Sequence, residues 1–329
     1  MSSSLVRGAG EQVEVPAPGT SDLPRPPAGA AMSKKGRKDK KGKAGYLFLT
    51  PWIIGYVCLT LGPIIASLYF SFTDYSLLAS PHWVGLKNYS DMFHDKRYWA
   101  SVIVTVKYVF IGVPIKLGIA LLIALLLKDG LRHMSVYRAI YYVPSLLGGS
   151  VAIAILWRQI FGDPGIFQSF LALFGIESQG WLTSPATSLN TLIVLEAWQF
   201  GSPMLIFLAG LRQMPQDLYD SAAVDGAGPV RKFWNVTLPL LTPILFFNLV
   251  LQMIGSFQAF TPSFIISSGT GGPVDSTLFY TLYLYIQGFG NLQMGYASAM
   301  AWVLLVVVGG ITGLLFFTAK YWVFYGDAR

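Results

Sequence analysis

Residues 295–319 read GYASAMAWVLLVVVGGITGLLFFTA and contain no charged side chain. An α-helix needs about 20 consecutive, predominantly apolar residues to cross the hydrocarbon core of a bilayer. This stretch is long enough, and it holds no charge whose burial in lipid would be costly. We therefore predict that it forms a membrane-spanning helix.

Five further stretches are of similar length and predominantly apolar, although three of them carry one or two charged residues; they are residues 46–70, 99–127, 139–161, 189–211 and 241–266. The composition agrees, because 53% of the residues are hydrophobic and only 12% are charged, whereas soluble domains contain about 25% charged residues. The sequence therefore predicts an all-α, polytopic membrane protein with six transmembrane helices.

Lysine and arginine are unevenly distributed around these stretches. Nine of the 23 precede Gly45, whereas residues 162–188 and 267–294 contain none. Because basic segments are retained in the cytoplasm, we predict that both termini are cytoplasmic and that the protein lies in the cytoplasmic (inner) cell membrane. A basic run beside an apolar helix is typical of a contact with lipid headgroups. Without interleaved aromatic residues it does not indicate nucleic-acid binding.

Residues 1–44 are rich in Pro, Gly, Ser, Ala and Lys, and we expect this basic tail to be disordered. The membrane domain is predicted to span residues 45–325. The chain contains no GxxxxGK[ST] nucleotide-binding loop, and its single cysteine and three histidines show no metal-ligand spacing. We therefore expect no catalytic, cofactor-binding or metal-binding residues in this chain.

The predicted cytoplasmic segment 212–240 is too long and too polar for a tight turn. Residues 216–224 can form a short helix whose small side chains at Ala222 and Ala223 let another protein approach closely. Gly226 can adopt a positive φ angle, which suits a turn between two short helices. We predict a docking surface here, and an ordinary surface linker is the alternative.

Asp220-Ser221-Ala222, Asp225-Gly226-Ala227 and residues 236–239 (VTLP) resemble the EAA signature of binding-protein-dependent importers. The resemblance is closest to sugar permeases related to the maltose and glycerol-phosphate systems. Further landmarks of that family occur in order at residues 71–75 (SFTDY), 84–89 (VGLKNY), 198–200 (WQF), 271–273 (GGP) and 295–299 (GYASA). The resemblance covers about residues 45–325 and implies the ABC type I importer permease fold. Asp220 stands where the family has glutamate, and Ser221 where it has alanine.

This resemblance implies that the first short helix of the segment couples the chain to a separate ATPase. The residues that it assigns to coupling are Tyr219, Asp220, Ser221, Ala222, Asp225, Gly226 and Ala227. It implies three partners, namely a second homologous permease, an ATPase dimer that binds ATP and Mg²⁺, and an extracytoplasmic solute-binding protein. The chain is then not itself an enzyme. Residues 269–273 are a secondary candidate contact with the binding protein.

Polar residues inside the predicted helices are candidates for a substrate passage, because such residues usually face the interior of a bundle. Glu196 beside Trp198 is typical of a sugar site, and the resemblance adds neighbouring positions and the helix after the coupling segment. The candidates are Glu196, Trp198, Gln199, Phe200, Gln252, Ser256, Phe260 and Ser263. The last four are spaced as on one helical face. Polar contacts that only hold helices together are the alternative. Lys116 lies deep in its helix and needs an acidic or carbonyl partner.

The favoured function is import of a carbohydrate by alternating access. Glycerol phosphate or a polyol is a second possibility for the substrate, although the scarcity of intramembrane arginine argues against a phosphate ester. An ion-coupled secondary transporter, with Glu196 as proton carrier, and a channel or scaffold are the alternatives of another class.

Overall fold

The computed structural model describes residues 41–128, 134–175 and 180–324. Most of the predicted tail lies outside these ranges, but its last residues begin helix α1. The described residues divide into two units, one that ends at Val57 and one that begins at Cys58. In the first unit, α1 (Lys41–Tyr56) contains Pro51, and Trp52 stacks on Tyr56 at 5.5 Å between ring centroids.

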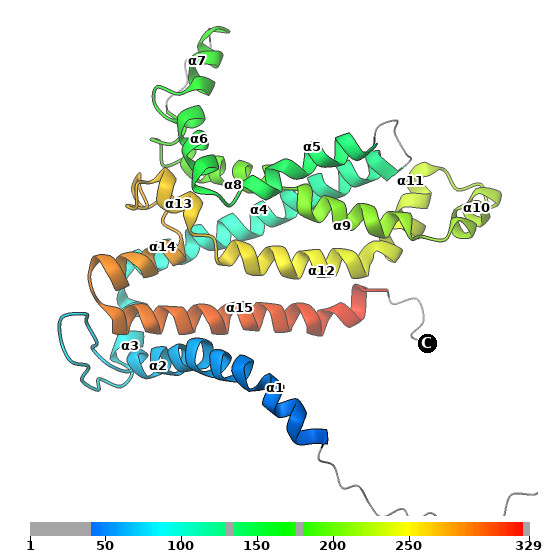
Figure 1. The fold of residues 1–329 in the computed structure, drawn as a ribbon. Helices are drawn as coiled ribbons and strands as arrows, with labels where there is room; N and C mark the ends of the chain where they lie inside the picture. Colours follow the sequence, from blue (N-terminus) through cyan, green and yellow to red (C-terminus); the bar gives the residue numbers. More distant parts are fainter. Residues whose placement is uncertain (1–40, 129–133, 176–179, 325–329) are drawn as a thin grey trace, which may run out of the picture. The chain divides into compact units, whose positions relative to one another are not determined.

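The described part of the second unit consists of helices joined by turns and loops (Figure 1). After a π-helical turn (Val57–Leu61), the helices are α2 (Gly62–Ser71), α3 (Lys87–His94), α4 (Lys96–Lys128), α5 (Met134–Leu147), α6 (Val151–Phe161), α7 (Ile166–Ala172), α8 (Ser188–Trp198), α9 (Gly201–Arg212), α10 (Gln216–Val224), α11 (Pro229–Lys232), α12 (Leu238–Phe257), α13 (Thr261–Ile266), α14 (Tyr280–Tyr285) and α15 (Met294–Trp322). Two further π-helical turns, Phe233–Thr237 and Ile286–Gly290, precede α12 and follow α14.

Among the residues that the structure describes, five helical segments are long and apolar enough to cross a membrane, and a bent pair supplies a sixth candidate. The five are Phe48–Ser71, Lys96–Lys128, Ser188–Arg212, Pro229–Ile266 and Met294–Trp322. Burial differs sharply among them, because 56% of the apolar window of Ser188–Arg212 is buried but only 6% of that of Met294–Trp322. Ser188–Arg212 therefore lies inside the bundle, and α15 exposes an apolar surface suited to lipid.

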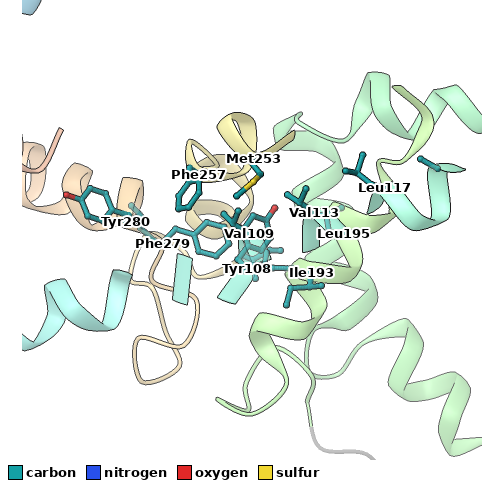
Figure 2. Packing of buried hydrophobic residues seen from close by; sticks show 14 of the residues in the cluster. Tyr108, Val109, Val113, Leu117, Ile193, Leu195, Met253, Phe257, Phe279 and Tyr280 are labelled. Atoms are coloured by element: carbon teal, nitrogen blue, oxygen red, sulfur yellow. The ribbon is translucent and has the colours of Figure 1, made fainter. Parts of the chain in front are cut away.

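The core of the second unit lies where α4, α8 and α12 meet the segment that leads into α14 (Figure 2). Tyr108 of α4 and Phe279 are almost completely buried, and their rings lie 4.5 Å apart. Leu195 and Met253 contribute side chains from α8 and α12. Side chains from three distant segments thus fix the position of the middle of α4.

The predicted continuous helix over residues 139–161 is wrong, because it breaks between α5 and α6, and the segments Ser135–Leu147 and Val151–Ala172 are bent by 94° relative to each other. Gly148 and Gly149 lie at this bend, and glycine weakens a helix interior. Ser150 then begins α6, since its side chain accepts a hydrogen bond from the backbone N–H of Ile153. A Cβ atom on Gly148 would collide with the side chain of Gln199, so a larger residue there would displace Gln199.

Two other predicted helices are interrupted, each close to a proline. α8 ends at Trp198 before α9, where Pro203 has no N–H to donate to the carbonyl of Gln199. The hydroxyl of Ser145 donates to that carbonyl instead, at 2.9 Å. The predicted helix 241–266 likewise ends at Phe257, and α13 starts afresh with Pro262 in its first turn.

Two pairs of short helices lie at opposite ends of this unit. α10 and α11 lie at one end of the bundle, and α13 and α14 lie at the other (Figure 1). α4 runs between the two ends, and it packs against α8, α9, α12 and α14. A single helix therefore contacts most of the unit.

Candidate functional site

The carboxylate of Glu196 is held at the centre of the bundle by three side chains. One oxygen accepts hydrogen bonds from the Lys116 ammonium and the Ser256 hydroxyl, both at 3.0 Å. The other accepts from the Tyr108 hydroxyl at 2.9 Å. All four residues are buried, and Glu196 is 8% exposed. The group, which we call the central quartet, joins α4, α8 and α12.

The quartet lines a cavity of about 350 Å³, a volume at the lower end of the range for small-molecule sites. The rest of the wall is polar or small: it includes the amides of Gln199, Gln252 and Gln258 and the glycines at 148, 149 and 255. Phe260 supplies an aromatic side chain. The cavity thus combines hydrogen-bonding amides, an internally neutralised charge pair and the aromatic rings of Tyr108 and Phe260.

Five of the eight predicted passage residues line this cavity, namely Glu196, Gln199, Gln252, Ser256 and Phe260. The prediction that Gln252, Ser256, Phe260 and Ser263 share one helical face is wrong, since α12 ends before Phe260. The interruption of the helix nevertheless leaves Phe260 at the cavity. The other three predicted residues lie elsewhere.

Those three residues make structural contacts. Ser263 is fully buried and donates to the carbonyl of Thr277. The ring of Trp198 packs against Trp157, and that of Phe200 against Tyr141, at centroid distances of 6.1 and 6.0 Å. The indole beside Glu196 therefore stabilises contacts between α6 and α8 and does not line the cavity.

The cavity is chemically suited to a solute with many hydroxyl groups. Glutamine amides can donate and accept hydrogen bonds, and an aromatic ring can contact the apolar face of a sugar ring. The contacts of Glu196 with Lys116 and Tyr108 leave its carboxylate largely satisfied within the protein. Such a pair presents dipoles to a solute and no unbalanced charge.

The second candidate site is α10 with the turn that follows it. The N–H of Gly226 bonds to the carbonyl of Ala223 at 3.0 Å, and the N–H of Ala227 bonds to that of Ala222 at 2.9 Å. Gly226 has a φ angle of +75°, as the sequence predicts. These are the bonds of a Schellman motif, in which glycine is favoured. The motif ends α10 sharply and turns the chain toward α11.

The predicted coupling residues divide into an exposed group and an inward one. Asp220, Ser221 and Asp225 are exposed. Tyr219 is only 8% exposed and points into the protein, so it does not offer an apolar anchor to a partner. Leu218 and Val224 are the exposed apolar side chains of α10, at 42% and 88%. Beside the helix, Ala222, Asp225, Ala227, Arg231, Lys232, Asn235 and Val236 line a hollow of about 300 Å³.

At the opposite end, Asp95 accepts hydrogen bonds from the Tyr283 and Tyr296 hydroxyls and from the backbone N–H of Arg97. Partial burial raises the pKa of Asp95, but these hydrogen bonds outweigh it and lower the pKa below its usual value. Arg97 pairs with both oxygens of Asp275, at 2.7 and 3.0 Å. These contacts hold the loop that contains residues 269–273 against the start of α4.

Sequence reasoning missed several residues of these sites. Lys116 was expected to need an acidic partner, but Tyr108 and Gln258 were not singled out. Tyr108 and Lys116 are eight residues apart in α4, a spacing that places them on nearly the same helical face, so that spacing could have paired them. Gly148 lines the cavity because the chain bends between α5 and α6, and the length of an apolar stretch does not reveal such a bend.

A bundle of broken apolar helices around a polar cavity, with a short helix pair at one end, defines a membrane permease. The chain belongs to the family described as the binding-protein-dependent transport system inner membrane component, whose model matches residues 93–321. It is the permease component of an ABC importer.

Relatives match over nearly their whole length. The probable ABC transporter permease protein YesP of Bacillus subtilis (strain 168) is 52% identical over 300 residues, covering 90% of this chain and 97% of YesP. AraP, the arabinooligosaccharides transport system permease protein of the same organism, is 31% identical and covers 86% of this chain and 91% of AraP. A chain from the crystal structure of a bacterial alginate ABC transporter has the same fold, with a TM-score of 0.74, 20% identity and coverage of 85% and 95%.

Proposed function

We propose that this chain moves a carbohydrate across the cytoplasmic membrane through the cavity around the central quartet. The observation that carries the proposal is the polar, amide-lined cavity at the middle of the bundle, with Glu196 already paired to Lys116. The name of the relative AraP, a permease for arabinooligosaccharides, supports a sugar as the solute. A polyol fits the same hydrogen-bonding groups.

In this proposal the motor is a separate ATPase dimer, which binds ATP and Mg²⁺ and docks on the exposed side of α10. A second permease completes the pathway, and a solute-binding protein delivers the sugar at the opposite end. The charge distribution supports placing the α10 end in the cytoplasm, since the last turns of the helices that end there carry basic residues. They are Lys128, Arg212, Arg231, Lys232 and Lys320.

The pairing of Glu196 also argues against the ion-coupled alternative. A side chain that carries protons must be exposed to solvent in one state so that it can exchange its proton. The Glu196 carboxylate instead makes three hydrogen bonds within the protein. Proton coupling would require these bonds to break in each cycle. ATP-driven movement of whole helices does not.

The test uses the complete importer in proteoliposomes, with the partner solute-binding protein outside. A panel of neutral sugars is first screened against the binding protein by fluorescence, and the sugar that binds most tightly becomes the test oligosaccharide. We expect its uptake to require ATP inside the vesicles and to continue when a proton ionophore removes any gradient. Uptake driven by a proton gradient without ATP would contradict the proposal.

A substitution links uptake to the cavity. Gln252→Leu removes an amide from the cavity wall, and we expect uptake of the test oligosaccharide to slow by about three- to tenfold, the range for loss of one neutral hydrogen bond. Asn190→Ala is the matched control, because Asn190 is an exposed amide of α8 outside the cavity. Equal uptake by the two variants would show that the solute does not contact this wall.

A further inference from the structure

The end of α4 contacts the inward side of α10. Lys128, the last residue of α4, places its ammonium 4.1 Å from the centre of the Tyr219 ring. A cation at this distance over an aromatic face is attracted by the negative face of the ring. The contact joins two helices that are separated in sequence by α5 to α9.

Tyr219 is itself fixed on its other side. Its hydroxyl lies 3.0 Å from the hydroxyl of Thr237, in the π-helical turn before α12, and 3.1 Å from the sulfur of Met214. The side chain is 8% exposed, so these contacts are shielded from solvent. Tyr219 therefore connects α10 with both α4 and the start of α12.

The same helix α4 carries two members of the central quartet. Lys116 lies twelve residues before Lys128, which corresponds to roughly 18 Å along a helix. The intervening residues contain no proline, since Pro114 precedes Lys116. This part of α4 can transmit a displacement of its end to the ion pair at the cavity.

We propose that Lys128 and Tyr219 are positioning residues that transmit the movement of α10 to α4, and through α4 to the Lys116–Glu196 pair. The inference rests on the proposed function, because a partner ATPase must move α10. The exposed residues of α10 then receive the ATPase, while the buried ring of Tyr219 passes the motion inward. Docking and transmission are separate tasks of opposite faces of one short helix.

The test measures molecules of the test oligosaccharide imported per ATP hydrolysed, in proteoliposomes with the complete importer. Lys128→Met removes the ammonium but keeps an unbranched side chain, and we expect the ratio to fall by about threefold or more, the factor for loss of a cation–π contact. Lys128→Arg keeps a cation over the ring and is expected to retain a ratio near that of the unsubstituted protein. Tyr219→Phe and Thr237→Val each remove the hydroxyl contact and should lower the ratio in the same direction.

Lys320→Met is the matched control. Lys320 also lies over aromatic rings, 4.4 Å from Phe317 and 4.9 Å from Tyr321, but these contacts lie within α15. We expect this variant to import the same amount of solute per ATP as the unsubstituted protein. An equal fall in Lys320→Met and Lys128→Met would show a general effect of removing charge and would overturn the proposal.

Two further outcomes would overturn it. One is an unchanged ratio in Lys128→Met. The other is loss of the ATPase from the purified Lys128→Met complex, which would show that the contact only holds the docking surface together. Failure of the proposed function differs from both, because the unsubstituted importer would then take up no sugar with ATP.

Discussion

At the scale of single residues, the contacts within the central quartet allow two charged side chains to be buried inside the bundle. A buried ion pair is strongly destabilised when one partner is removed, because the other charge is left unpaired. Lys116 and Glu196 are 7% and 8% exposed, and their contact distance is 3.0 Å. Tyr108 and Ser256 complete the hydrogen bonding of the carboxylate.

We therefore predict that Glu196→Gln and Lys116→Met each destabilise the protein by about 3–5 kcal/mol. The double variant, which leaves neither charge, should be less destabilised than either single variant. Thermal unfolding of the purified importer in detergent measures the effect as a lower midpoint temperature. Additive losses in the double variant would contradict a coupled pair.

The control for this prediction is an exposed ion pair in the same chain. Arg97→Gln breaks the contact with Asp275, whose atoms approach to 2.7 Å but whose side chains are partly exposed. Surface pairs contribute about 0–1 kcal/mol, so this variant should unfold at nearly the original temperature. A loss as large as that of Lys116→Met would show that burial is not the deciding factor.

The sequence was most informative about which types of residue line the cavity, and least informative about which side chains contact one another. Intramembrane polarity was enough to select Glu196, and the family resemblance added Gln252; both residues line the cavity. The resemblance also added Ser263, whose hydroxyl donates a hydrogen bond to the carbonyl of Thr277. A polar side chain facing a cavity and one that satisfies a neighbouring carbonyl follow the same sequence pattern, so only their contacts separate them.

At the scale of elements, interruptions of helices shape both candidate sites. The bend between α5 and α6 places Gly148 against Gln199 at the cavity. The break after α12 brings Phe260 to the same cavity. At the far end of the bundle, the Schellman motif ends α10 and exposes Val224 and Asp225.

We predict that Gly226→Ala weakens binding of the partner ATPase by about tenfold. A residue with a Cβ atom in the left-handed region costs about 1–2 kcal/mol, and Gly226 has a φ angle of +75°. Gly228→Ala is the matched control, since its φ angle is −70° and a Cβ atom at either glycine meets nothing within 4 Å. The affinity of the purified ATPase for each variant is the measurement, and equal affinities would contradict the role of the turn.

Apolar length predicts where helices cross the membrane, but it does not predict where they break. The predicted stretches 139–161 and 241–266 are both long and predominantly apolar, and yet both are interrupted. Gly148, Gly149 and Pro262 were visible in the sequence. Glycine and proline are tolerated in membrane helices when neighbours satisfy the freed backbone groups, so their presence alone does not show a break. The Ser145 contact that satisfies the carbonyl of Gln199 depends on tertiary packing.

At the scale of the whole molecule, the structure agrees with the expected all-α permease fold and adds a connection between its ends. α4 carries Arg97 near one end, Tyr108 and Lys116 at the cavity and Lys128 at the other end. Family landmarks in the sequence predicted the fold class, because they occur in order along most of the chain. They did not predict the connection through α4, because it depends on which side chains of distant helices meet.

Alternating access makes the most direct prediction for the whole molecule, because the cavity must open to opposite sides in turn. The chain has one cysteine, Cys58, so Cys58→Ser gives a background without thiols in this subunit. Gln252→Cys then places a single thiol at the cavity wall. Val306→Cys is the control, since Val306 is 66% exposed on α15 and does not line the cavity.

The decisive measurement is labelling of Gln252→Cys by a membrane-impermeant thiol reagent in the reconstituted importer, with the other subunits also made free of accessible thiols. We predict labelling from the α10 side without nucleotide, and from the opposite side when ATP and vanadate trap the closed ATPase. Val306→Cys should show no such exchange. Labelling from the same side in both states, or from both sides at once as in a channel, would contradict transport through this cavity by alternating access.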